Sequence, residues 1–206
     1  MDNITINCHS SICIGEDVYI DPYNITNIKK NAKCIFITHS HYDHLDMASI
    51  KNLATEDTII VGTKDSIDML REEGYEEENL KTVKPFESGL AYDVKYQTFP
   101  AYNINKKFHP KENGWVGYTL TINGLNYTIC GDSDKTPELE QIKTDILLIP
   151  VGGTYTMTAE EAAFLANIIK PTFAIPTHYG SIVGTMADGK IFCDSLKNIE
   201  SKLLIK

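Results

Sequence analysis

Three histidines and one aspartate occupy four of the six positions from 39 to 44, in the order His-x-His-x-Asp-His. They follow a short apolar run rich in β-branched residues, which predicts a buried strand. Side chains two apart on a strand share a face, so His39 and His41 are expected to converge on one metal ion if the strand geometry continues. A turn after the strand can then direct Asp43 and His44 towards a second site. Imidazole and carboxylate ligands favour zinc, with manganese and iron as the other options.

A loop that is merely rich in histidine is the alternative interpretation of this stretch. It describes most single histidines, which are surface residues or satisfied core residues. Four metal-binding side chains in six positions at the end of a buried strand make that interpretation improbable here.

The pattern His-x-His-x-Asp-His is the signature of the metallo-β-lactamase superfamily, and the chain resembles this superfamily in three further segments. Residues 131–134 are similar to the segment that carries the bridging aspartate, and residues 176–179 to the segment that carries the last histidine. Residues 150–157 resemble the loop between them in the small, single-domain branch of these hydrolases. The resemblance covers essentially the whole chain.

This resemblance implies a dinuclear zinc site and a hydrolase. The implied ligands of the first metal are His39 and His41, and those of the second are Asp43, His44 and His178. Asp132 is the implied bridging ligand of both metals. The implied catalytic residues are Asp43 and Asp132. Two divalent ions need a carboxylate to offset their repulsion, and they lower the pKa of a shared water from 15.7 towards about 7. The implied reaction is attack by the resulting metal-bound hydroxide on a small ester, lactone or phosphodiester.

The sequence leaves the identity of the third histidine ligand of the first metal undetermined. In the superfamily it lies between the main motif and the bridging aspartate, where this chain has Asn103 in the matching segment and His109 shortly after it. An amide oxygen is a poorer zinc ligand than imidazole. Either His109 completes the site or the first metal has only two histidines and binds weakly. We predict that His109 matters to this metal and that Asn103 does not bind it directly.

Substrate contacts are expected from two other regions. The resemblance implies that His9, near the first hairpin, and Asp21 border the metal site, although His9 is equally well explained as a hairpin residue. The glycines at 152–153 can allow the backbone to approach a ligand closely. Thr154 or Tyr155 can then donate a hydrogen bond to a developing oxyanion. A tight structural turn is the alternative for this loop.

Composition restricts the cellular setting. The chain has 206 residues, 42% of them hydrophobic, which suits one globular domain over residues 1–206. A formal net charge of −9 disfavours nucleic-acid partners.

No stretch reaches the roughly 20 apolar residues of a membrane span. The first residues lack a secretory pattern, and the five cysteines form no C-x-x-C pair, so we expect a cytoplasmic protein with a small-molecule substrate. Homo-oligomer formation is left open. Lysines that could meet an anionic substrate group are Lys106, Lys107 and Lys111.

Secondary-structure signals favour an α/β fold with mixed sheets. The hydrophobic pattern predicts helices over 46–53, 63–73 and about 189–200, and strands over 58–61, 81–83, 145–149 and 173–175. Asn123-Gly124 predicts a two-residue hairpin turn, Thr136-Pro137 a helix start, and Thr158 with Glu161 a capping box. An antiparallel half and a β/α half, with ligands at strand ends, fit a four-layer αββα sandwich.

Two other functions share this sequence pattern. An RNA-processing nuclease would carry the same metal motif, but the acidic charge and the lack of an RNA-docking insertion disfavour it. A metal-binding regulatory protein that has lost turnover is compatible with the asparagine at position 103.

Overall fold

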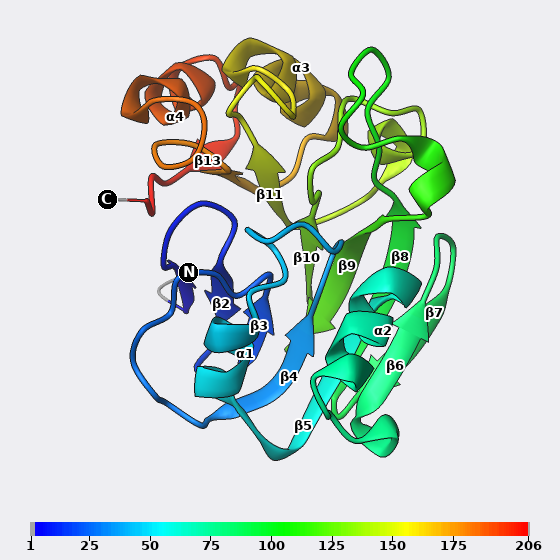
Figure 1. Cartoon of the computed structure of the whole chain (residues 1–206). Coiled ribbons are helices and arrows are strands. Elements are labelled where there is room, and N and C mark those ends of the chain that lie inside the picture. The colour runs from blue at the N-terminus through cyan, green and yellow to red at the C-terminus, as the bar shows by residue number, and fades with distance from the viewer. Residues whose placement is uncertain (1–2, 206) are drawn as a thin grey trace.

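The computed structural model describes residues 3–205, whose strands form two sheets packed face to face (Figure 1). The first sheet is antiparallel between its first three strands and parallel between the remaining ones. In order across the sheet, its strands are β1 (Ile4–Ile6), β2 (Ile12–Ile14), β3 (Val18–Ile20), β4 (Ala32–Phe36), β5 (Ala54–Thr63) and β6 (Leu80–Val83).

The second sheet combines a parallel half and an antiparallel half. In order across the sheet, its strands are β13 (Glu200–Ser201), β12 (Phe173–Thr177), β11 (Ile146–Pro150), β10 (Leu125–Ile129), β9 (Val116–Ile122), β8 (Val94–Pro100) and β7 (Ser88–Ala91). Strands β10 to β13 pair in parallel, whereas β7 to β10 are antiparallel.

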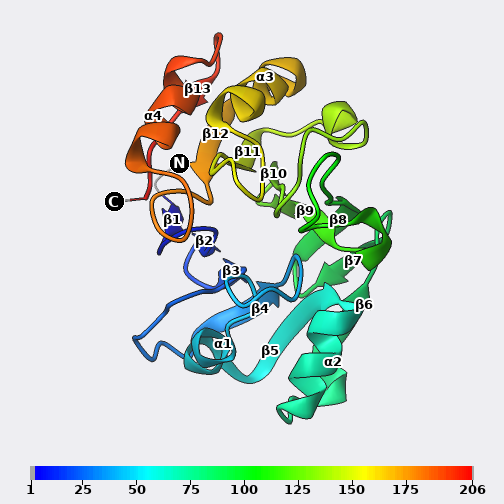
Figure 2. The same ribbon diagram turned by 45° about the horizontal axis from the view of Figure 1, so that its top comes forward.

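Helices cover the outer faces of both sheets, as the two views in Figures 1 and 2 show. The α-helices are α1 (Met47–Leu53) and α2 (Lys64–Glu72) on the first sheet, and α3 (Ala159–Ile169) and α4 (Met186–Asp194) on the second. The part of the chain that the structure describes also contains three short 3₁₀ helices: η1 (Glu77–Asn79), η2 (Lys111–Asn113) and η3 (Leu139–Gln141). The predicted αββα arrangement is confirmed. Within residues 3–205, no helix is long and apolar enough to cross a membrane.

Strand β4 shows why the two sheets stay together. The ring of Phe36 points between the sheets, where its centroid lies 5.8 Å from that of Tyr96 and 5.3 Å from that of Tyr118. Its neighbours Ile35 and Ile37 belong instead to the buried cluster beneath α1 and α2. A strand that is buried on both faces is apolar throughout rather than alternating. This double burial explains the continuous apolar run before the histidine motif.

The hairpin between β9 and β10 is confirmed. Ile122 lies opposite Leu125, so the loop contains only Asn123 and Gly124. Both loop residues have positive φ angles, 51° and 80°, as a two-residue turn of the primed type requires. The hairpin sends β10 back towards the edge of the sheet, and Asp132 follows shortly after that strand ends.

The last predicted helix has the wrong bounds. Instead of spanning about 189–200, α4 begins at Met186 and ends at Asp194. The earlier start follows from a capping box in which Asp188 accepts from the Thr185 amide at 2.5 Å. The early end follows because the chain turns back at Ser195 to form β13 beside β12.

The expected helix start at Thr136-Pro137 produces only the short η3. The Thr136 hydroxyl does accept a hydrogen bond from the Leu139 amide, at 3.2 Å. The chain then becomes extended at Ile142, because it must enter β11 at Ile146. By contrast, the capping box at the start of α3 is confirmed: the Thr158 hydroxyl accepts from the Glu161 amide and the Glu161 carboxylate accepts from the Thr158 amide.

Candidate metal centre

The predicted ligands lie where strands end at one edge of the two sheets. His39 follows β4, Asp132 follows β10, and His178 directly follows β12. His9 lies in the turn between β1 and β2, and His109 in the long connection between β8 and β9. Parallel strands deliver their carboxyl ends to the same edge, which explains how segments distant in sequence meet.

His39, His41 and His109 form a first imidazole group, in which one nitrogen from each ring lies within 4.8 Å of the others. The Nε2 atom of His39 is 3.1 Å from Nδ1 of His41. The ring of Trp115 packs against all three, with centroid distances of 4.8, 4.7 and 5.4 Å to His39, His41 and His109. Trp115 was not among the predicted site residues, although its position soon after His109 in the sequence could have indicated it.

Asn103 contacts His109 and orients it. The Asn103 Nδ2 donates to the carbonyl oxygen of Tyr155 at 3.0 Å, and this bond fixes which way the amide points. Its oxygen therefore faces His109, where it lies 3.1 Å from Nδ1 and accepts a hydrogen bond from that nitrogen. The proton on Nδ1 leaves Nε2 of His109 as the nitrogen that is free to bind a metal.

A second group consists of His9, Asp43, His44 and His178, again with ligand atoms within 4.8 Å of one another. Oδ2 of Asp43 is 3.1 Å from His9 Nε2 and 3.8 Å from Nε2 of both His44 and His178. His9 is fully buried, so its closest polar contact is Asp43 rather than a molecule in solution. The substrate contact expected for His9 from the sequence is therefore not what the structure shows for this side chain.

The backbone holds His9 and His178 together. The amide of His178 donates to the carbonyl of His9 at 3.0 Å, and the two ring centroids are 3.7 Å apart. Both residues have left-handed backbone conformations, with φ of 53° for His9 and 59° for His178. Such conformations in non-glycine residues are uncommon and cluster at functional sites.

Asp132 lies between the two groups. Its Oδ2 is 3.0 Å from Nε2 of His178 and 3.2 Å from Nε2 of His109, and its Oδ1 is 3.2 Å from Nε2 of His44. One buried carboxylate thus reaches a histidine of the first group and two histidines of the second.

These close approaches fit metal ligands better than hydrogen bonds. The atoms His44 Nε2, His109 Nε2, His178 Nε2 and Asp132 Oδ1 are all buried without a hydrogen-bond partner among the described residues. Buried polar atoms are normally paired. Ligands held 2.0–2.2 Å from a tetrahedral zinc ion lie about 3.3–3.6 Å from each other, which is close to the spacings here. The residues present therefore fit one or more divalent cations.

Asp21 fixes the orientation of His44. Its carboxylate accepts from the amide and hydroxyl of Thr38 at 2.8 and 2.7 Å, and lies 2.8 Å from Nδ1 of His44. When Nδ1 donates to Asp21, Nε2 faces the centre. A carboxylate behind a histidine is a recurrent feature of metal sites.

Most protonation states also suit cations. The exception is His44: burial lowers the pKa of its ring, but the charges of Asp132 and Asp21 outweigh burial and raise it well above its usual range, so a metal ion must displace a proton there. Burial disfavours ionisation of Asp43, but the hydrogen bond from His9 and the charge of His44 outweigh it and lower the pKa of Asp43 to about 2. The pKa of Asp132 is likewise well below its usual range, because His178 and His44 outweigh burial. Burial lowers the pKa of His39 and His41, so both rings are neutral and able to bind a metal at neutral pH.

The loop that contains Gly152 and Gly153 packs against other parts of the protein rather than facing an open space. A Cβ atom on Gly152 would lie 2.2 Å from the carbonyl oxygen of His178, so the missing side chain lets this loop pack against the last histidine. Tyr155 gives its carbonyl to Asn103, and its ring meets Phe108 edge-on at 4.5 Å. The Thr154 amide donates to Gly152 within the turn.

Comparison with known proteins identifies the family. Residues 4–178 match the model of the beta-lactamase superfamily domain. The chain belongs to the metallo-β-lactamase superfamily. A UPF0173 protein of Pyrococcus abyssi is 30% identical over 85% of this chain and 80% of its own length. A UPF0173 metal-dependent hydrolase of Chloroflexus aurantiacus is 28% identical over 81% of this chain and 72% of its own length.

A solved structure of this superfamily shows the same architecture. The crystal structure of a protein from Parabacteroides distasonis, described as a metal-dependent hydrolase, superposes with a TM-score of 0.81 at 29% identity. The match covers 98% of this chain and 93% of that one. The predictions of a metallo-β-lactamase fold and of a metal-dependent hydrolase are therefore confirmed at the level of the family.

Proposed function

We propose that this protein hydrolyses a small ester, lactone or phosphodiester with the help of two divalent metal ions, zinc first among them. The observation that carries the proposal is the position of Asp132, which lies within 3.2 Å of imidazole nitrogens from both groups. A bridging carboxylate is what two neighbouring cations require. When bound, such a pair lowers the pKa of a water molecule and polarises the carbonyl or phosphoryl oxygen of the substrate.

The chain's own residues then have distinct tasks. The proposed ligands are His39, His41 and His109 for one ion, Asp43, His44 and His178 for the other, and Asp132 for both. Ionised Asp132 offsets the repulsion between the cations. Asn103 sets the tautomer of His109, and Asp21 sets the tautomer of His44. His9 holds Asp43 by a 3.1 Å hydrogen bond. Tyr155 and Thr154 are the proposed hydrogen-bond donors to the substrate.

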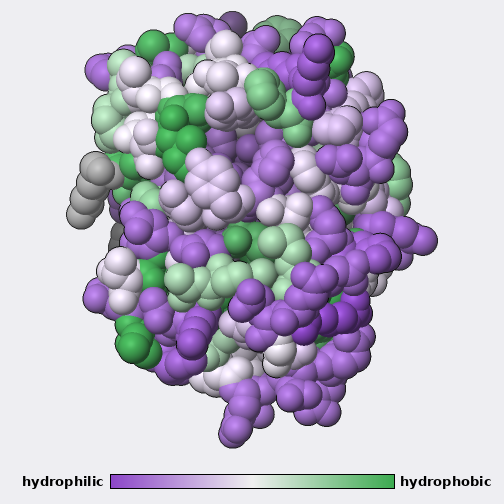
Figure 3. Space-filling view, in the orientation of Figure 1, coloured by the Kyte–Doolittle hydropathy of each residue, from purple (hydrophilic) through white to green (hydrophobic). Residues whose placement is uncertain are grey.

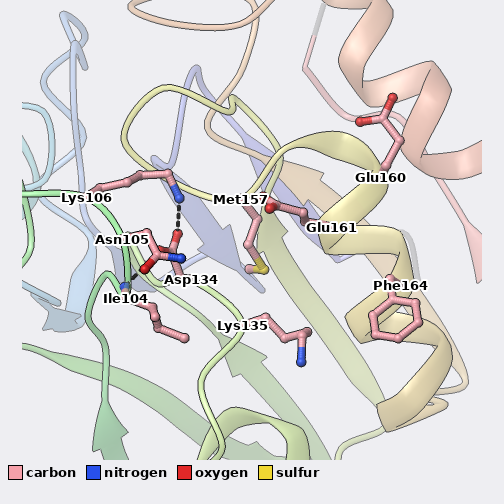
Figure 4. A pocket seen from close by; sticks show the side chains of 9 residues that line it. All are labelled: Ile104, Asn105, Lys106, Asp134, Lys135, Met157, Glu160, Glu161 and Phe164. Atoms are coloured by element: carbon pink, nitrogen blue, oxygen red, sulfur yellow. Dashed lines mark hydrogen bonds and ion pairs between the residues drawn. The ribbon is translucent and has the colours of Figure 1, made fainter.

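Two nearby lysines are already paired, which favours an uncharged ester or lactone over an anionic phosphodiester. Lys106 Nζ lies 2.5 Å from Asp134, an ion pair drawn in Figure 4, and Lys111 Nζ lies 2.8 Å from Glu138. The cavity of ≈ 610 Å³ in that figure includes residues 104–106 in its lining but none of the histidines. Because none of the proposed ligands lines it, this cavity is not the metal centre itself.

A panel of chromogenic esters, lactones and phosphodiesters tests the reaction. We expect the metal-loaded protein to hydrolyse an ester or lactone, to lose this activity after chelation, and to regain it when zinc or manganese is added. A protein that holds two metal ions but turns over no member of the panel would instead support a regulatory metal-binding protein.

We further expect no useful binding of RNA or DNA at physiological salt. The net charge of −9 disfavours contact with phosphates. The face of the molecule in Figure 3 is largely hydrophilic, with apolar residues in patches. A filter-binding assay checks this expectation. Binding at micromolar concentration or below, lost steeply as salt rises, would contradict it and support the nuclease alternative.

A further inference from the structure

Asp65 lies in the first turn of α2, outside the candidate ligand set, yet its carboxylate connects two segments that carry the first imidazole group. Its Oδ2 accepts from the Ser40 hydroxyl at 2.6 Å and from the Trp115 indole nitrogen at 2.8 Å. Its Oδ1 accepts from the Thr63 hydroxyl at 2.6 Å. An aspartate early in a helix usually serves only its own helix. Here two of the donors are 25 and 50 residues away along the chain.

The Ser40 contact acts on the spacing of two ligands. Ser40 is the residue between His39 and His41, whose facing nitrogens are 3.1 Å apart. A hydrogen bond that anchors the Ser40 side chain to α2 restrains the turn in which both neighbouring rings are held. This restraint would set their separation before a metal binds.

The Trp115 contact acts on the rings themselves. The indole is nearly buried and packs against the imidazoles of His39, His41 and His109. Indole nitrogen is only a donor, so its bond to Asp65 determines the orientation of the ring in its slot. The wall against which all three imidazoles rest therefore depends on one carboxylate.

The charge of Asp65 strengthens these contacts. Burial raises the pKa of its carboxyl, but the hydrogen bonds from Ser40, Thr63 and Trp115 outweigh burial and lower it overall. The carboxylate is ionised at neutral pH, and hydrogen bonds to an ionised acceptor are roughly twice as strong as those between neutral groups. Its place in the first turn of a helix also favours negative charge.

We propose that Asp65 is a positioning residue of the first metal site, which holds the three imidazoles of the first group in place through Ser40 and Trp115. The proposal rests on the proposed function in one respect, namely that these imidazoles bind a metal ion. Loss of a group that orients metal ligands typically lowers metal affinity by about 10–100-fold.

The variant Asp65→Asn tests this role, because it keeps the size of the side chain but loses the charge and one acceptor oxygen. Asp68→Asn is the matched control: Asp68 lies on the same helix, is 39% exposed, and pairs with Lys64 and Arg71 at the surface. Zinc affinity is measured by competition with a chelator of known affinity. The fluorescence of Trp115, the only tryptophan of the chain, follows the same titration.

We expect Asp65→Asn to bind one of its two zinc ions about 10–100-fold more weakly, and Asp68→Asn to behave as wild type. Ser40→Ala and Trp115→Phe each remove one donor to Asp65, and each should weaken the same ion by a smaller factor. They also keep the test decisive if Asp65→Asn does not fold. Thermal unfolding of each metal-free variant separates a loss of affinity from a general loss of stability.

Wild-type affinity for both ions in Asp65→Asn would overturn the proposal, as would wild-type affinity in both Ser40→Ala and Trp115→Phe. Either result leaves the proposed function intact. A wild-type protein that binds no zinc would instead refute the proposed function, and the role of Asp65 with it.

Discussion

Asp132→Ala is expected to lose the paired metal site and with it the hydrolytic activity. The variant removes the one carboxylate that lies within 3.2 Å of His44, His109 and His178. Two cations would then face each other without the negative charge that offsets their repulsion. Metal content should fall from two ions to one at most. A metal ion contributes several kcal/mol to transition-state stabilisation, so kcat/KM should fall by about 10³-fold or more.

Elemental analysis after dialysis, combined with kinetics on the best ester or lactone, checks this expectation. Asp93→Ala is a suitable control, because the Asp93 side chain is 77% exposed and forms an ion pair with Lys33 at the surface. It should keep both metal content and turnover. An Asp132→Ala protein with two bound ions and undiminished turnover would show that Asp132 does not bridge the site.

His109→Ala should reduce occupancy to about one metal ion, whereas Asn103→Ala should keep both. His109 directs Nε2 at the centre, and few ligands remain for the first ion without it. Asn103 uses its oxygen on His109 and its nitrogen on the Tyr155 carbonyl, so neither atom is available to a metal. Removing such an orienting group typically lowers metal affinity by about 10–100-fold without abolishing binding.

The same dialysis and elemental analysis compares these two variants. If His109→Ala keeps two ions and Asn103→Ala loses one, then the amide is the ligand and the histidine is not. A loss of one ion in both variants would show that His109 cannot bind unless Asn103 orients it.

Local patterns in the sequence predicted much of this fold. His39 and His41 do come together, with facing nitrogens 3.1 Å apart, but β4 ends at Phe36, so both histidines lie beyond the strand and the expected alternation along a strand is not what brings them together. The Asn123-Gly124 turn and the Thr158 capping box depend on neighbouring residues only, and both were predicted correctly. The end of α4 was not, because the pairing of β13 with β12 stops it, and pairing between distant segments leaves no local signal.

The same distinction applies to the candidate site. The histidine motif and the resemblance to the superfamily together named most of the histidines and carboxylates that the fold brings together. The role of Asn103 could not be predicted, because it depends on where the Tyr155 carbonyl lies after folding. Likewise, the burial of His9 beside Asp43 follows from a backbone bond to His178 at the far end of the chain. Nothing near Asp65 in the sequence indicates that it meets Trp115.

Metal content of the wild-type protein, purified without chelators and measured by elemental analysis, tests the central claim most directly. We expect two equivalents of divalent metal per chain, mainly zinc. Metal that binds only the folded state must also stabilise it, by about 4 kcal/mol when free zinc is 1,000 times the dissociation constant. A protein that contains no metal, and whose thermal unfolding is the same with and without added zinc, would contradict the proposed metal centre.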